Sequence, residues 1–204
     1  MKKFCLLVTF ALAFAGGAAA QSDQGTVVKT ANGFLVVSNE PGNYYTVELK
    51  GKTVTQDPDC PVCLMVDNKP VEVVAVSKRH FLKDPTEALD DMGLLIAYRN
   101  WENESLSNLY DSRLDPLTVW LKLADGSRAV VWSYDKPPRF DGDKDIVTRV
   151  ALATVKGNHL LLMDISVGKN TDVKEPQQFL LDAMNSLRTS DKPISIEKVR
   201  YLTR

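Results

Sequence analysis

Short apolar segments with β-branched and aromatic residues alternate with turn residues along the chain, and this pattern predicts strand pairs. Residues 34–38 and 44–49 flank a turn that is rich in Asn, Pro and Gly. Residues 62–66 and 71–76 flank a second turn composed of Asp, Asn, Lys and Pro. The first third of the chain is therefore expected to form two antiparallel hairpins.

A third hairpin is predicted around Asp125-Gly126, because this dipeptide favours a type I′ turn that fixes the register of the strands beside it. A two-residue turn would place six residues on one face, pairing Leu121 with Val130, Val119 with Trp132 and Leu117 with Tyr134. Apolar and polar positions then alternate across the hairpin as they do in a half-buried sheet.

A fourth strand pair is expected from residues 147–155 and 159–166, which turn at Lys156-Gly157-Asn158. Its apolar positions do not alternate, because residues 160–163 read Leu-Leu-Leu-Met. Strands that are apolar on both sides belong in the middle of a sheet with both faces covered.

Two stretches have helical spacing instead. Asp84, a proline and Glu87 form a capping-box pattern, and the apolar spacing behind it predicts a helix over residues 85–108. A second helix is predicted from about Pro176 to Leu187, where the apolar residues form one stripe.

These elements predict an α+β fold, in which a single antiparallel sheet built from hairpins carries two main helices. We expect residues 33–190 to form one domain. Residues 21–32 are small and polar and predict a flexible N-terminal segment, and residues 191–204 predict a C-terminal tail or an added edge strand.

The first twenty residues have the features of a secretory signal peptide. Lys2 and Lys3 precede an apolar run, which ends at three alanines that favour cleavage between Ala20 and Gln21. The remaining chain has no apolar run long enough to span a membrane, so we expect a periplasmic or secreted protein. Its slightly acidic balance, with a formal net charge of −1 for the whole chain, argues against nucleic acid as a partner.

The element order resembles that of the Mog1/PsbP-like group of α-β-α sandwich proteins, above all in the run from Asn158 to Asp164 followed by a helix that ends at Leu187. The similarity is one of layout over roughly residues 33 to 190. It implies an accessory or binding protein without catalysis, because members of that group are mostly partner-binding subunits. It assigns no role to any residue of this chain.

Cys60 and Cys63 are the two cysteines that remain after the leader is removed, and in an oxidising compartment we expect them to form a disulfide. The C-P-x-C spacing also occurs in thiol oxidoreductases, so a redox protein is the alternative. Residues 64–66 read as a strand, which offers no helix N-terminus to activate Cys60. The sequence favours a structural role.

No metal or cofactor is expected. His80 and His159 are far apart and match no zinc spacing, and the acidic loop from Asp141 to Asp145 lacks the glycine and glutamate of a calcium-binding EF-hand. The sequence contains no recognised motif for a catalytic nucleophile. A hydrolase would need an unrecognised site, and it is the third possibility.

Several aromatic residues have two interpretations: rings that flank a large core, which the sequence favours, or contacts with a partner. Tyr98, Trp101 and Tyr110 on the first helix, with Tyr44 and Tyr45 at a strand start, exceed what one core-facing stripe needs, and aromatic residues are enriched at interface centres. The leading expectation is thus an exported, non-catalytic accessory protein that binds another envelope protein or a small ligand.

Overall fold

The computed structural model describes residues 26–57, 60–84, 86–137, 146–157, 159–168 and 171–202. The strands are β1 (Thr26–Thr30), β2 (Gly33–Glu40), β3 (Asn43–Leu49), β4 (Val54–Asp57), β5 (Cys60–Val66), β6 (Lys69–Val76), β7 (Leu117–Lys122), β8 (Arg128–Asp135), β9 (Ile146–Lys156), β10 (His159–Gly168) and β11 (Arg188–Ser190). The helices are the 3₁₀ turn η1 (Lys78–His80), α1 (Asp91–Leu109), α2 (Lys174–Asn185) and α3 (Ile196–Leu202).

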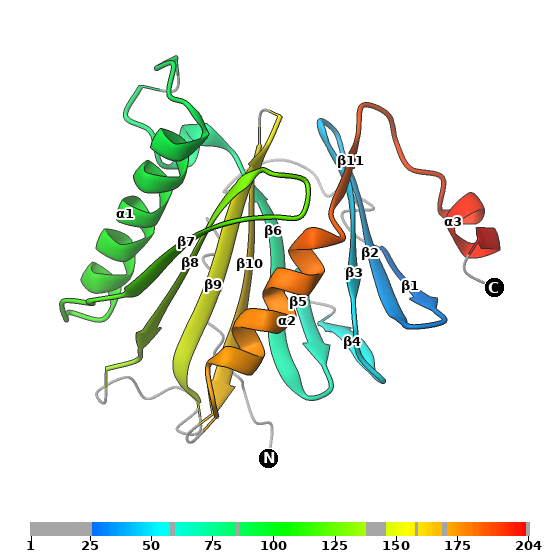
Figure 1. Cartoon of the computed structure of the whole chain (residues 1–204), viewed down its shortest axis with the longest axis horizontal. Coiled ribbons are helices and arrows are strands. Elements are labelled where there is room, and N and C mark those ends of the chain that lie inside the picture. Colours follow the sequence, from blue (N-terminus) through cyan, green and yellow to red (C-terminus); the bar gives the residue numbers. More distant parts are fainter. Residues whose placement is uncertain are drawn as a thin grey trace.

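The strands form antiparallel sheets, with α1 and α2 on opposite faces of the larger one (Figure 1). This sheet has the order β4-β5-β6-β10-β9-β8-β7, and hairpins join most of its neighbours. The predicted α+β class, the hairpins and the two main helices are confirmed.

The strands divide between two sheets, where the sequence pattern indicated one. The hairpin of β2 and β3 belongs to a four-stranded sheet with the order β1-β2-β3-β11, because β11 pairs with the outer edge of β3. The outer edge of β6 pairs with β10. Both pairings join segments that are distant in sequence, and hairpin patterns carry no information about them.

Two hydrophobic cores lie on the two faces of the seven-stranded sheet. The first core lies between this sheet, α2 and the inner face of the four-stranded sheet, which contributes Val36, Val47 and Leu49. The second lies under α1. On β10, Leu161 and Met163 enter the first core and their neighbours enter the second, so the prediction of a central strand covered on both faces is confirmed.

The first helix begins later than predicted. Asp90 caps α1, since its Oδ1 accepts a hydrogen bond of 2.8 Å from the Gly93 N–H. The carboxylate of Asp84 accepts from the Thr86 N–H at 2.9 Å, which closes a local turn instead. Two acids were available as caps, and the start at residue 85 is wrong because the first one is used in that turn.

The β7–β8 hairpin is shifted by one residue from the predicted register, because Leu121 pairs with Ala129 and Val119 pairs with Val131. Its loop has three residues, and Gly126 alone adopts a positive φ, of 85°. A type I′ turn needs two such residues, whereas one left-handed glycine closes a three-residue loop with a bulge. Because of this shift, Trp132 and Val119 lie on different faces of the sheet instead of on the same face.

Both ends of the described chain are more regular than predicted. Thr26–Thr30, within the segment expected to be flexible, pair with β2. After β11 the backbone of Ile194 is held by Asn39, whose amide donates to the Ile194 carbonyl at 2.9 Å and accepts from its N–H at 2.7 Å. Residues 196–202 then form α3 rather than an edge strand. The leader lies outside the described residues.

Gly33 lies where the start of β2 passes close to the end of β3, and a substitution there tests this close approach. It has a φ of 155°, and a Cβ there would lie 2.3 Å from the Leu49 carbonyl oxygen, whereas Gly42 has a φ of 84° with open space around it. We predict that Gly33→Ala lowers the free energy of unfolding by more than about 2 kcal/mol, and Gly42→Ala by about 1 kcal/mol. Urea unfolding measures both, and equal losses would show that the close approach is not limiting.

Candidate functional site

A groove runs along β11, where the adjoining ends of β9 and β10 approach the four-stranded sheet. Its first hollow has a volume of about 330 Å³ and is lined by residues that include Tyr44, His159 and Asp191. A second hollow of about 470 Å³ lies beside Arg188, and Lys156 and Thr189 line both. We call this continuous surface the junction groove.

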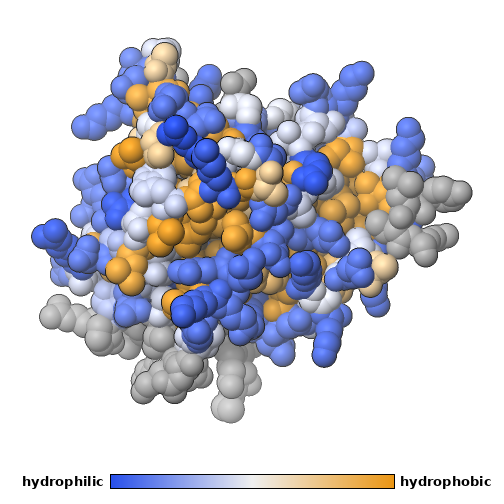
Figure 2. Space-filling model, viewed as in Figure 1, coloured by the Kyte–Doolittle hydropathy of each residue, from blue (hydrophilic) through white to orange (hydrophobic). Residues whose placement is uncertain are grey.

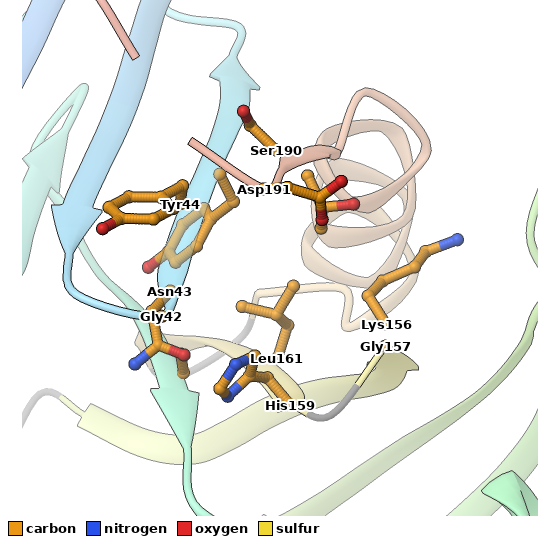
Figure 3. Close-up of a pocket in the computed structure, with 12 residues that line it drawn as sticks. Gly42, Asn43, Tyr44, Lys156, Gly157, His159, Leu161, Ser190 and Asp191 are labelled. Atoms are coloured by element: carbon orange, nitrogen blue, oxygen red, sulfur yellow. The ribbon is translucent and has the colours of Figure 1, made fainter. Parts of the chain in front are cut away.

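Several segments that are distant in sequence supply the walls of the first hollow (Figure 3). Asn43 and Tyr44 come from the start of β3, His159 and Leu161 from β10, and Asp191 from the chain just after β11. The hollow arises because the β9–β10 hairpin turns beside the β2–β3 turn. The phenol ring of Tyr44, the imidazole of His159 and the carboxylate of Asp191 therefore line one hollow.

Lys156 marks the boundary between the two hollows, but its ammonium group is already engaged. It forms an ion pair with the Asp125 carboxylate and donates to the Ser127 hydroxyl at 3.0 Å. The hydrogen bond from Lys156, with those from Ser127, lowers the pKa of Asp125. The charge of Lys156 is directed at the β7–β8 loop, and Figure 3 shows its side chain pointing away from the middle of the first hollow.

The five aromatic residues suggested as partner contacts divide between the groove and the cores. Tyr44 is half-buried in the groove wall, and Tyr45 reaches the same hollow from the first core, where burial raises its pKa to about 12. Tyr98 and Tyr110 are buried under α1, and Trp101 is half-buried beside Tyr98, with ring centres 5.8 Å apart. Of the five, the two on β3 line the groove, and Tyr44 is the more exposed of them.

The cysteine segment forms a strand. Cys63 is buried on β5 opposite Glu72 of β6, and its Sγ lies 3.9 Å from Glu72 Oε1. Of Cys60 the structure describes the backbone, which belongs to the same strand. No helix begins at either cysteine, so the activating geometry of thiol oxidoreductases is lacking in this described segment.

The two histidines lie in different places. His80 is exposed at the end of η1, and His159 begins β10 in the groove wall. Within the described ranges no three His, Cys, Asp or Glu side chains are grouped closely enough to hold a metal ion. The acidic loop from Asp141 to Asp145 lies outside those ranges.

A buried ion cluster occupies the second core, and it was missed in the sequence analysis. Arg149 of β9 lies among three carboxylates: Asp164 at 2.5 Å, Glu72 at 3.6 Å and Glu102 at 3.9 Å. The guanidinium also donates to the Tyr134 hydroxyl at 3.3 Å. We call these four charged residues the arginine cluster.

The arginine cluster has more potential negative charge than its one guanidinium can balance. Burial, and then the charge of Asp164, raise the pKa of Glu72 to about 8 against the opposing effect of Arg149. Burial also raises the pKa of Glu102 to about 7. Protonation of both glutamates near neutral pH would leave Arg149 paired with Asp164.

The sequence contains a signal for this cluster. Asp164, Arg149 and Glu72 each interrupt a strand segment that is otherwise apolar, at positions that must point into a core. A charge at such a position needs a partner, because an unpaired buried charge is costly. Three such interruptions on three strands indicate that the strands are neighbours.

Comparisons with known proteins assign no family to this chain. No family model matches the chain, and no curated protein matches it. A solved structure, that of cyanobacterial PsbP from Synechocystis sp. PCC 6803, matches 86% of this chain and 99% of its own length, with 11% sequence identity and a TM-score of 0.44. Within the described residues, no helix combines the length and apolar character needed to cross a bilayer.

Glu102 generates a prediction for the pH dependence of stability. The pKa of the Glu102 carboxyl is raised in the folded state. Its contribution to the free energy of unfolding is therefore highest below about pH 4.5 and is lost as the pH rises through about 7. The wild type should lose unfolding free energy between about pH 5 and 8.5. We predict that Glu102→Gln loses at least about 1 kcal/mol less than the wild type over this range. Chemical denaturation across this range measures the slope.

Glu104→Gln is the matched control, because Glu104 lies on the same helix with an exposed side chain. It should leave the slope of the wild-type protein unchanged. Parallel pH profiles for the wild type and Glu102→Gln would contradict the assignment of a raised pKa.

Proposed function

We propose that this chain is an exported, non-catalytic accessory protein that binds an extended segment of another envelope protein along the junction groove. The observation that supports this most directly is the elongated form of the groove, since its two hollows meet at Lys156 and Thr189. A compact ligand needs one enclosed pocket, whereas a strand-like segment needs a long open one.

The backbone of β11 supports the same proposal. Arg188, Thr189 and Ser190 are exposed, and β11 is the last strand of its sheet, paired with β3 on one side. Within the described part of the chain its other edge has no strand beside it, so its N–H and C=O groups can accept an added strand. The half-buried Tyr44 ring offers an apolar contact next to it.

The charges along the groove favour a protein segment over a strongly charged partner. Arg188 carries a positive charge and Asp191 a negative one, while Lys156 and Asp125 neutralise one another. Neither sign dominates, so the groove suits a peptide of mixed or neutral composition.

The leader and the cysteine pair complete the proposal. Residues 1–20 would direct the chain out of the cytoplasm, and Cys60 and Cys63 would then close a disulfide at the start of β5. The burial of Cys63 on a strand supports a structural bond rather than a redox centre.

Photo-crosslinking from Thr189 tests the groove. We predict that a photoreactive amino acid at Thr189 crosslinks one envelope protein in the native host, and that Thr189→Arg abolishes capture by a probe at Asp191. Thr55 is the matched control, because it is an exposed threonine on β4, another short edge strand. The same products from Thr55 and Thr189, or none from Thr189, would contradict the proposal.

The redox alternative is tested by the double variant Cys60→Ser, Cys63→Ser. Loss of a small disulfide loop should lower the free energy of unfolding by about 2 kcal/mol. Partner capture from Thr189 should persist. A double variant that folds with unchanged stability but loses its cellular role would favour thiol chemistry instead.

A further inference from the structure

Glu102 is the charged residue among the buried residues of α1. The others are Leu94, Leu95, Tyr98 and Leu106, so the carboxyl lies in the middle of the contact between this helix and the sheet. Glu102 is 6% exposed, and its Oε1 lies 3.9 Å from the Arg149 guanidinium. Its Oε2 is buried without a hydrogen-bond partner in the described part of the chain. An ionised carboxylate is costly here, because its surroundings replace little of the water that it has lost.

Titratable and charged groups face Glu102 from each element around it. They are Arg149 of β9, Asp164 of β10, Glu72 of β6, Tyr134 of β8, Tyr98 of α1 and Tyr110 at the end of that helix. Burial raises the pKa of the three tyrosines, so they are neutral below about pH 10. The charge of this region is therefore set by one guanidinium and three carboxyl groups.

Ionisation of both glutamates leaves an excess of negative charge inside the second core. Burial raises the pKa of Glu102 to about 7, against the opposing effects of Arg149 and of a hydrogen bond from the Trp132 indole. The other three members of the arginine cluster lie on β6, β9 and β10, and each of these strands is paired on both sides. Glu102 lies on a helix that rests on the sheet through its side chains. Movement of α1 is therefore the least disruptive way to bring an ionised carboxylate to water.

Hydrogen bonds attach one side of α1 to the segment that leads into β7. Arg99 donates to the Thr118 hydroxyl at 2.9 Å, and two turns later the Ser107 hydroxyl accepts from the Leu114 N–H at 3.1 Å. The strand members of the arginine cluster lie away from β7, on β9, β10 and β6. The helix is thus bonded on the β7 side and faces the excess charge on the other, which is the arrangement of a hinge.

We propose that α1 is a pH-dependent cover over the second core. When Glu102 is ionised, the helix swings outward about its bonded side and the carboxylate reaches water. When Glu102 is protonated, the helix stays closed. Opening uncovers side chains of β8, among them Val130 and Trp132, that are buried under the closed helix. Trp120 of β7 pairs with Val130 and is already 42% exposed, and Figure 2 shows apolar surface over this strand, which the opening would extend.

The direction of the effect follows from the two environments of Glu102. Its carboxyl binds a proton more tightly in the closed state, where the pKa is about 7, than in water, where the ordinary value is 4.5. The closed state is therefore most favoured below about pH 4.5, and this preference is lost as the pH rises through about 7. Between about pH 5 and 8.5 the ratio of open to closed molecules should rise more than about tenfold.

Hydrogen–deuterium exchange of the purified protein, measured by mass spectrometry, tests the proposal. A helix detached from its core is marginally stable, so the amides of α1 exchange when it opens. After correction for the intrinsic exchange rate, the protection of α1 should fall by more than about tenfold between about pH 5 and 8.5. It should end below the protection of β10, whose amides exchange only in larger openings. Equal protection of α1 and β10 at pH 8.5, or no pH dependence of α1, overturns the proposal.

Two variants separate Glu102 from other effects of pH. Glu102→Gln should keep the protection of α1 at pH 8.5 within about threefold of its value at pH 5, because the amide stays neutral. Glu104→Gln, on the exposed side of the same helix, should show the wild-type dependence. The same pH dependence in Glu102→Gln and the wild type overturns the proposal. Partner binding in the junction groove does not enter this test, so its outcome is independent of the proposed function.

Discussion

The rest of the structure depends on the burial of β9 and β10 on both faces. Strands in this position must place every side chain in a core, and they do so by sending alternate residues to α1 and to α2. The two helices are consequently held on opposite faces. The β9–β10 turn must lie at a sheet end, and this position brings His159 against the four-stranded sheet and creates the junction groove.

The arginine cluster is the exception to this apolar rule, and its location gives it a structural consequence. Arg149 and Asp164 lie on the two central strands, and Glu102 reaches them from the middle of α1. A buried ion pair contributes little net stability, yet removing one member leaves an uncompensated charge. The cluster therefore favours one placement of α1 over others that apolar packing alone would permit.

The sequence predicted what local patterns control. Alternation and turn residues identified the hairpins, and the run Leu160–Leu161–Leu162–Met163 identified a central strand. Two errors arose where local signals competed: Asp84 and Asp90 were both suitable caps, and Asp125-Gly126 suits either a two-residue or a three-residue loop. In both cases the two local alternatives differ in free energy by about 1 kcal/mol, and tertiary packing can easily reverse such a difference.

The long-range features lay beyond such patterns. The pairing of β6 with β10 joins residues more than eighty positions apart, and the three-residue β11 is too short to have a periodic pattern. The groove depends on both, so Tyr44 could be suggested as a contact residue while His159 and Asp191 could not be placed beside it. The charged interruptions at Arg149 and Asp164 were readable in the sequence, because buried charges require partners.

The four sheet edges differ in how open they are to other chains. The β1 edge lies beside α3, and β4 is short, irregular at Gln56, and polar at its exposed positions. These are ordinary ways to keep an edge from pairing with other chains. At β11 the edge is short and opens onto a groove, which limits what can bind to a segment that fits the groove. At β7 the edge is longer, and Leu117, Val119 and Trp120 on it are exposed. An edge with those properties is open to pairing with another strand.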